Sequence, residues 1–261
     1  MTTVDIQFSP AVTDWPTLRA AAREAEARGY RAVHTFDHLS GQALDGHTMI
    51  DTFVLLGALA EATTTIGLGT MVANVWNRQA GTLVSAIGGL GAMTGRQVVF
   101  GLGAGSAPGT TWAAEHDAVG ADLEPELSKR HDRVRHVLDL CDAEWTSERE
   151  ERFATFPLPS RRPLTIVGAN SVALCRLAAE RADGVCLQWQ HPRRTEFAET
   201  IDELVGDRPF VRVAYTTYSP GLLDPDHPDR QEMLAAGTDR LVLPVFDDLR
   251  SWLDDDIAPN A

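Results

Sequence analysis

The stretch IGLGTMVANVWNRQAGTLVSAIGGLGAMTGRQVVFGLGAG, residues 66–105, contains a strand, a helix and a second strand in succession. The two strand segments, 66–74 and 97–105, are almost continuously apolar, whereas a strand with one face in water would alternate apolar and polar residues. Continuous apolar strands indicate burial on both faces. The stretch therefore predicts a parallel sheet whose strands are connected by helices such as 79–94.

The same unit recurs on both sides of this stretch. The helix after the first strand begins near Thr13, Asp14 and Pro16 and ends at Gly29, the usual order of capping residue, first-turn proline and terminal glycine. We expect eight strand–helix pairs, with strands at 4–10, 32–37, 66–74, 97–105, 164–169, 183–189, 210–218 and 240–246, and with the later helices at 50–62, 79–94, 122–142, 171–181, 193–205, 229–236 and 247–256.

Eight such units in 261 residues predict an α/β protein that folds as a single (β/α)8 TIM barrel domain over residues 1–261. A doubly wound open sheet is the alternative. It is disfavoured because no GxGxxG motif follows the first strand, and because the glycines of GLGAGS (101–106) have the spacing GxGxG, which is not the dinucleotide-binding fingerprint.

Composition and charge exclude several classes of partner and site. A formal net charge of −14 argues against a nucleic-acid partner, which would require a basic surface. The three cysteines, Cys141, Cys175 and Cys186, have neither zinc-ligand nor disulfide-framework spacing, so we expect buried thiols and no metal site. No signal segment and no membrane span are found. We therefore expect a cytoplasmic protein with no membrane partner.

In a barrel of this kind the chemistry lies where the strands end, at their carboxyl side. The segment AVHTFDHLSG (32–41) places Asp37 and His38 there. The strand ends lack the paired carboxylates of a glycosidase, a strand lysine for Schiff-base chemistry and the HxH pair of a metal-dependent hydrolase. A site that is poor in acid–base groups and rich in glycine suits a cofactor that supplies its own reactivity.

Two glycine-containing segments are candidates for holding such a cofactor. Gly101, Gly103 and Gly105 would let a ligand approach the backbone closely, or they could serve only tight packing of a barrel strand. The segment VGANS (167–171) could present backbone N–H groups of a helix start to a phosphate, or it could be a capped helix without a ligand.

The chain resembles the luciferase-like monooxygenase superfamily, especially the branch that uses coenzyme F420, a 5-deazaflavin. The matching segments follow the family order: DWPTLRAAAREAEARGYRAVHTFDHL (14–39), LLGALAEATTTIGLGTMV (55–72), GAMTGRQVVFGLGAGS (91–106), PLTIVGANSVALCRLAAERADGVCL (163–187) and LAAGTDRLVLPVF (234–246). The resemblance independently implies a (β/α)8 barrel.

The resemblance also implies roles for individual residues. Asp37 and His38, the two predicted catalytic residues, would lie beside the deazaflavin ring, with His38 positioning the substrate or assisting proton movement. A non-prolyl cis peptide, forming a bulge behind the ring, is expected at or next to Met71–Val72. The residues expected to bind the cofactor are Asp37, Thr70, Met71, Val72, Asn74, Gly103, Ala104, Gly105, Ser106, Gly168, Ala169, Asn170 and Ser171.

The chain departs from the family at two places. Relatives that oxidise a sugar phosphate have a glutamate at the position of Ser106, so that substrate is not supported. The segments 143–163 and 190–209 are shortened insertion regions, which would leave the pocket open or completed by a second subunit, and a homodimer is expected.

Several arginines and tryptophans are further candidates. Arg161, Arg162, Arg193 and Arg194 are candidate partners for the oligoglutamate tail of the deazaflavin, although solvated surface charges would look the same. Trp76, Trp112 and Trp189 are candidates for an apolar wall over the ring, although simple packing would also explain them.

Three functions fit these features. The first is a coenzyme F420-dependent oxidoreductase that moves a hydride between the deazaflavin C5 and a small organic substrate. It is favoured by the FDH motif at 36–38, because many flavin-dependent relatives have Glu-His there. The second is an FMN-dependent monooxygenase, and the third is a non-catalytic barrel that binds a phosphorylated ligand.

Overall fold

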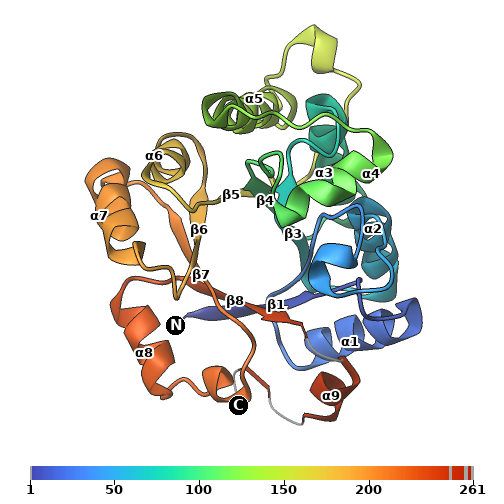
Figure 1. Cartoon of the computed structure of the whole chain (residues 1–261), viewed down its shortest axis with the longest axis vertical. Helices are drawn as coiled ribbons and strands as arrows, with labels where there is room; N and C mark the ends of the chain where they lie inside the picture. The colour runs from blue at the N-terminus through green and yellow to red at the C-terminus, as the bar shows by residue number, and fades with distance from the viewer. Residues whose placement is uncertain (1, 247–248, 256–257, 260–261) are drawn as a thin grey trace.

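A computed structural model describes residues 2–246, 249–255 and 258–259 of the chain. Eight parallel strands close into a barrel in the order β1 to β8, as Figure 1 shows. The strands are β1 (Thr3–Phe8), β2 (Ala32–Thr35), β3 (Gly67–Asn74), β4 (Val98–Gly103), β5 (Leu164–Gly168), β6 (Gly184–Gln188), β7 (Val211–Tyr215) and β8 (Arg240–Val245). The prediction of a (β/α)8 barrel is confirmed.

The helices surround the barrel (Figure 1). They are α1 (Trp15–Ala27), α2 (Thr52–Ala62), α3 (Ala80–Thr94), α4 (Ala114–Val119), α5 (Leu127–Glu144), α6 (Val172–Arg181), α7 (Arg194–Val205), α8 (Pro228–Ala235) and α9 (Leu249–Asp254), with the short 3-10 helices η1 (Gln42–Leu44), η2 (Thr111–Ala113), η3 (Glu151–Phe153) and η4 (Pro220–Leu223). Asp14 caps α1 by accepting from the Thr17 N–H, at the predicted start of that helix.

Three predicted elements differ from the structure. The helix expected over 122–142 is α5, which begins only at Leu127, and the short helix α4 and η2 precede it. Most of the strands end one to three residues earlier than expected, because the chain there turns into the loops at the barrel mouth. Of the last predicted helix, 247–256, the structure has α9, while residues 247, 248 and 256 lie outside the described part of the chain.

The inside of the barrel is partly polar. On β1, Val4, Ile6 and Phe8 pack outward against the helices, so that Asp5 and Gln7 between them point inward. Asp5 Oδ2 accepts hydrogen bonds from His34 Nε2 at 2.8 Å and from Arg240 Nη1 at 3.0 Å, and all three side chains are buried. A buried ion cluster therefore lies inside the barrel, joining β1, β2 and β8.

Candidate functional site

A cavity of about 590 Å³ opens at the carboxyl ends of the strands. Its lining includes both predicted catalytic residues, Asp37 and His38, and ten of the other predicted cofactor-binding residues. These ten are Met71, Val72, Asn74, Gly103, Ala104, Gly105, Ser106, Gly168, Ala169 and Asn170. The fold thus brings together these residues, which the resemblance implied, from the loop after β2 and from the ends of β3, β4 and β5.

Two of the predicted cofactor-binding residues, Thr70 and Ser171, do not line this cavity. The Thr70 hydroxyl is buried in the barrel wall and donates to the Gly101 carbonyl at 2.8 Å. The Ser171 hydroxyl caps α6 by accepting from the Leu174 N–H. Both side chains therefore form hydrogen bonds to backbone groups, and Ser171 is the N-cap of α6.

Three glycines at and below the cavity floor are required by close neighbours in the barrel wall. A Cβ on Gly103 would lie 2.6 Å from Val72 Cγ2, and one on Gly168 would lie 3.0 Å from Val72 Cγ1. A Cβ on Gly101 would meet the Thr70 carbonyl oxygen at 2.2 Å. Packing of the barrel wall therefore explains these three glycines, and Val72 forms the raised part of the floor between β4 and β5.

Strand β3 carries the bulge that the resemblance implied. Its register against β4 shifts between Thr70 and Ala73, and the Met71–Val72 peptide bond is cis, at the expected position. Gln7 Nε2, from inside the barrel, donates to the Met71 carbonyl at 2.6 Å. This hydrogen bond holds the Met71 carbonyl on the side of the barrel interior.

Asp37 anchors the loop after β2. Its carboxylate accepts two hydrogen bonds from Arg78 Nη1, at 2.7 and 3.0 Å, and one from the Asn74 N–H at 2.9 Å. Burial alone would lower the pKa of Arg78, but Asp37 and Asp51 outweigh it and raise the pKa of the guanidinium. Asp37 is therefore a paired and buried group whose acceptor capacity is largely used by the protein.

His38 is paired with a carboxylate that the sequence analysis did not single out. His38 Nδ1 lies 3.1 Å from Glu115 Oε1, and Glu115 Oε2 accepts from the N–H groups of Leu39 and Ser40 at 3.0 and 3.1 Å. Burial raises the pKa of Glu115, but the hydrogen bonds from His38 and these N–H groups outweigh it and lower the pKa. An ionised carboxylate only accepts hydrogen bonds, so Nδ1 of His38 carries the proton.

Trp112 covers His38 from the side of the solvent. Its ring stacks on the imidazole with 5.1 Å between ring centroids and 28° between the planes, and Trp112 lines the cavity. The other two candidates for an apolar wall do not line it: Trp76 packs beneath Gly105, and Trp189 stacks under Arg194 outside the barrel. Of the three tryptophans, Trp112 is the one that lines the cavity.

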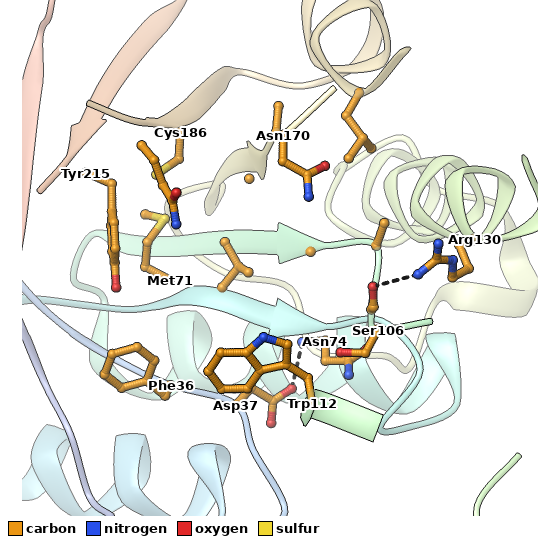
Figure 2. A pocket seen from close by; sticks show the side chains of 18 of the residues that line it. Phe36, Asp37, Met71, Asn74, Ser106, Trp112, Arg130, Asn170, Cys186 and Tyr215 are labelled. Carbon is orange, nitrogen blue, oxygen red and sulfur yellow. Dashed lines mark hydrogen bonds between the residues drawn. The ribbon is translucent and has the colours of Figure 1, made fainter. Parts of the chain in front are cut away.

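A cationic end of the cavity is formed by α5 and the loop after β4. Arg130 Nη1 donates to the Gly105 carbonyl at 3.2 Å, as Figure 2 shows, and its buried Nε has no hydrogen-bond partner. His131 Nε2 is likewise buried without a partner. Burial and the neighbouring Arg130 and Arg135 lower the pKa of His131. The lowered pKa favours the neutral form of His131, so the Arg130 guanidinium is the charged group beside the glycine turn that is suited to an anion.

The four arginines expected to bind a cofactor tail lie elsewhere. Arg161 and Arg162 come just before β5, at the amino ends of the strands and opposite to the cavity. Arg193 pairs with Glu196 at 2.6 Å, and Arg194 lies over Trp189. None of the four lines the cavity, so that expectation is not supported by their positions.

The cavity thus has two chemically different ends. In Figure 2, Phe36 and Tyr215 lie at one side and Arg130 at the other.

Within residues 2–246, 249–255 and 258–259 no group of three or more His, Cys, Asp or Glu side chains is placed to hold a metal ion. The three cysteines are unpaired and buried, and burial raises the pKa of the Cys186 thiol at the cavity wall to about 12.

The fold and the cavity define a (β/α)8 barrel protein with a ligand site at the carboxyl ends of its strands. Residues 2–242 match the family model of luciferase-like monooxygenases, and the chain belongs to that family. A 5,10-methylenetetrahydromethanopterin reductase from Methanolobus tindarius is 28% identical over 202 residues, which are 75% of this chain and 57% of the reductase. The chain therefore spans little more than half the length of this relative.

Solved structures share the fold. An F420-dependent secondary alcohol dehydrogenase, solved in complex with an F420–acetone adduct, superposes with a TM-score of 0.74 at 15% identity over 97% of both chains. The EDTA monooxygenase from Chelativorans sp. BNC1 superposes with a TM-score of 0.66 at 14% identity, over 83% of this chain and 62% of that one. Within the described residues, no helix is both long and apolar enough to span a membrane.

Proposed function

We propose that residues 1–261 form one domain that acts as a coenzyme F420-dependent oxidoreductase, transferring a hydride between the deazaflavin C5 and a small organic substrate. One observation carries this proposal: the cavity combines an oriented histidine–carboxylate pair, a floor that includes Val72, and the Arg130 guanidinium at its other end. The similarity to proteins named as F420-dependent supports the choice of cofactor.

The residues present fit a deazaflavin. Val72, Gly103 and Gly168 form a floor for a flat ring, and the Arg130 guanidinium, which lines the cavity, would face its phosphate or acidic tail. Asn74 Oδ1 accepts from the Trp76 N–H, so its Nδ2 is the group left to face the ring. The bound deazaflavin would supply the hydride-accepting or hydride-donating carbon.

The side chains around His38 determine which of its atoms can accept a proton. With the Nδ1 proton of His38 held by Glu115, the Nε2 atom is the proton acceptor that remains on the ring. Asp37 keeps its loop in place through Arg78, so its role is to position His38 and Asn74. His38 is accordingly the proposed catalytic residue, and Asp37 a positioning residue.

An FMN-dependent monooxygenase is the second candidate. The same cationic end could hold the FMN phosphate, and the EDTA monooxygenase has the same fold. The cofactor separates the two reactions, because reduced flavin activates oxygen whereas reduced deazaflavin scarcely reacts with it.

We further propose a cytoplasmic homodimer. Helices α2 and α3 leave apolar side chains in water, with Val54 67% and Met93 81% exposed. Val54 lies in the first turn of α2, where a second subunit would cover it in the proposed dimer. Sedimentation of the purified chain would give the mass of a dimer, and Val54→Asp would reduce it to that of a monomer.

The test of the cofactor is a titration of the purified chain with F420 and with FMN in parallel, followed by fluorescence. We expect tight binding of F420 and weak binding of FMN. Arg130→Leu should weaken F420 binding at least about tenfold, since a hydrogen bond to a charged group contributes about 1.5–3 kcal/mol.

Arg135→Leu is the matched control, because Arg135 lies on the same helix but pairs with Asp132 at the surface. Binding of FMN alone would favour the monooxygenase, and binding of neither would leave the phosphorylated-ligand barrel.

A further inference from the structure

We infer that Gln7 is a positioning residue for the bound ring: from inside the barrel it holds the Met71 carbonyl, and through it the Val72 side chain of the cavity floor. This inference rests on the proposed function, since the ring that would lie on this floor is that of the deazaflavin. Three observations carry it: the place of Gln7 in the barrel, the bulge in β3 and the incomplete pairing of the Gln7 amide.

Gln7 lies inside the barrel and does not line the cavity. It is fully buried, and its register partners are His34 on β2 and Pro244 on β8. Its neighbours along the chain, Ile6 and Phe8, pack outward against the helices, so the Gln7 side chain points inward. A ligand in the cavity therefore does not touch Gln7, and an effect of this residue on binding has to pass through another residue.

The bulge in β3 places Met71 and Val72 outside the regular pairing of the sheet. Strand β3 pairs with β2 as far as Thr70, and its pairing with β4 is interrupted after Thr70 and resumes at Ala73. The Met71 carbonyl accepts from Gln7 Nε2 at 2.6 Å, and Gln7 belongs to β1, which is not a neighbour of β3 in the barrel. This hydrogen bond therefore fixes a part of β3 that the pairing of the strands does not hold.

Val72 follows this carbonyl and forms part of the floor on which a ring would lie. Its methyl groups lie against β4 and β5, where a Cβ on Gly103 or Gly168 would come as close as 2.6 and 3.0 Å to them. Figure 2 shows Met71 among the side chains that line the cavity. Because a peptide unit is planar, a turn of the Met71 carbonyl also moves the nitrogen and Cα of Val72. Release of this carbonyl from Gln7 would therefore displace the floor beneath the ring.

The Gln7 amide adds less to stability than a fully paired amide would. Its Nε2 donates to Met71, whereas its Oε1 is buried and accepts no hydrogen bond from the described residues. A buried acceptor without a partner costs free energy that an apolar side chain of the same size does not. In Gln7→Met this acceptor disappears while the Met71 carbonyl loses a donor, so the two effects on stability have opposite signs. We therefore expect Gln7→Met to change ring binding much more than stability.

The test measures the binding of two probes by fluorescence titration. One is F420, and the other is 5-deazariboflavin, which has the deazaflavin ring but neither the phosphate nor the glutamate tail. Gln7→Met should weaken the binding of both probes about tenfold, because a displaced floor affects the ring that they share. Arg130→Leu should weaken the binding of F420 and leave that of 5-deazariboflavin unchanged, because Arg130 lies at the other end of the cavity.

Gln97→Met is the matched control for Gln7→Met. The Gln97 amide also donates to a backbone carbonyl, that of Val98 at 2.9 Å, but Gln97 lies at the amino end of β4 and does not line the cavity. We expect this control to bind both probes as the wild type does. The melting temperature of unliganded Gln7→Met should stay within about 4 °C of that of the wild type.

A double-mutant cycle with Val72→Ala tests the route by which Gln7 acts. If Gln7 acts through the Val72 side chain, Gln7→Met should weaken the binding of 5-deazariboflavin about tenfold in the wild type and less than about twofold in Val72→Ala. A merely structural role of Gln7 would give the same factor in both backgrounds.

Wild-type affinity of Gln7→Met for both probes would overturn the inference and leave the proposed cofactor standing. A Gln7→Met chain that does not fold, a weakening confined to F420, or equal factors in the two backgrounds of the cycle would overturn it as well. Failure of the wild type to bind either probe would remove the proposed function and, with it, this inference.

Discussion

Two histidine–carboxylate pairs contain histidines that are four residues apart along the chain, His34 and His38. The two pairs have opposite surroundings. His34 and Asp5 are 2.8 Å apart, both fully buried inside the barrel, and Asp5 also binds Arg240. His38 and Glu115 are 3.1 Å apart at the cavity mouth, where the His38 side chain keeps 21% of its exposure. A similar contact thus occurs once in the closed interior and once where a ligand can reach it.

The difference shows how position along one strand assigns a role. His34 Nδ1 is buried without a partner and lies near the backbone of Gly69, so no substrate reaches it. His38 comes two residues after Phe36, in the loop, and its Nε2 faces the cavity. We therefore expect the inner pair to determine stability and the outer pair to determine turnover.

The substitution His38→Ala should separate the two roles, turnover and stability, by the largest effect. Loss of the proposed proton carrier should lower kcat of the F420-dependent reaction at least about 1000-fold, within the range of general acid–base catalysis. The melting temperature should stay close to that of the wild type, because the side chain is partly exposed and its partner Glu115 keeps two backbone N–H donors.

Steady-state kinetics and calorimetric melting of the same preparation measure both effects. His136→Ala, an exposed histidine of α5 outside the cavity, serves as the control. A His38→Ala variant with full activity would remove His38 from the proposed mechanism.

The inner pair should show the reverse pattern. Asp5→Ala leaves the Arg240 guanidinium buried without its carboxylate, which should lower the free energy of unfolding by about 3–5 kcal/mol. Urea unfolding measures this loss. The double variant Asp5→Leu/Arg240→Met should recover much of it, since replacing a buried ion pair by apolar side chains is often neutral. A loss below about 1 kcal/mol in Asp5→Ala would contradict the assigned structural role.

Glu115→Gln changes the outer pair less than His38→Ala does. The amide keeps the shape of the side chain but no longer fixes which nitrogen of His38 carries the proton, so kcat should fall about 10- to 100-fold. F420 binding should be unchanged, because the cofactor donors lie at Arg130. An unchanged kcat would mean that His38 is oriented by Trp112 alone.

The outer pair also shows what the sequence could and could not predict. His38 was found because it ends an apolar strand in a family motif, and strand ends define the mouth of a barrel. Glu115 was not predicted as a site residue, because it comes 77 positions later, on a six-residue helix with no apolar periodicity of its own. Only the folded path of the loop after β4 brings it to His38.

The positions of the arginines illustrate the same limit. Arg161 and Arg162 could have been excluded as ligands of the cofactor tail from the sequence alone, since they precede a predicted strand and so lie at its amino end. Arg130 could not have been predicted as a cavity residue, because its place at the cavity depends on how α5 packs.

The glycines at 103 and 168 were expected at the site and line the cavity, but the close contact with Val72 that requires them depends on the bulge in β3.

The smallest effect that we predict is a pH dependence of stability. The pKa of Glu115 is lowered from its ordinary value of 4.5, despite burial, by His38 and by the backbone N–H groups. An acid with a lowered pKa in the folded state stabilises the fold fully above its unfolded pKa, and this contribution is lost as the pH falls through the folded value. The stability advantage of the wild type over Glu115→Gln should therefore be constant above about pH 5 and shrink below it.

Glu144→Gln is the control with the opposite sign. Burial raises the pKa of Glu144, outweighing the hydrogen bond from Ser85 and the charge of Arg149. The folded state then binds the proton more tightly than the unfolded state does, so the ionised carboxylate of the wild type destabilises the fold as the pH rises. Relative to Glu144→Gln, the wild type should lose stability as the pH rises above about 4.5 and through the raised folded-state pKa, whereas relative to Glu115→Gln it should gain stability as the pH rises to about 5. Urea unfolding at several pH values measures both differences, and slopes of the same sign would show that the Glu115 carboxylate is not held ionised by His38.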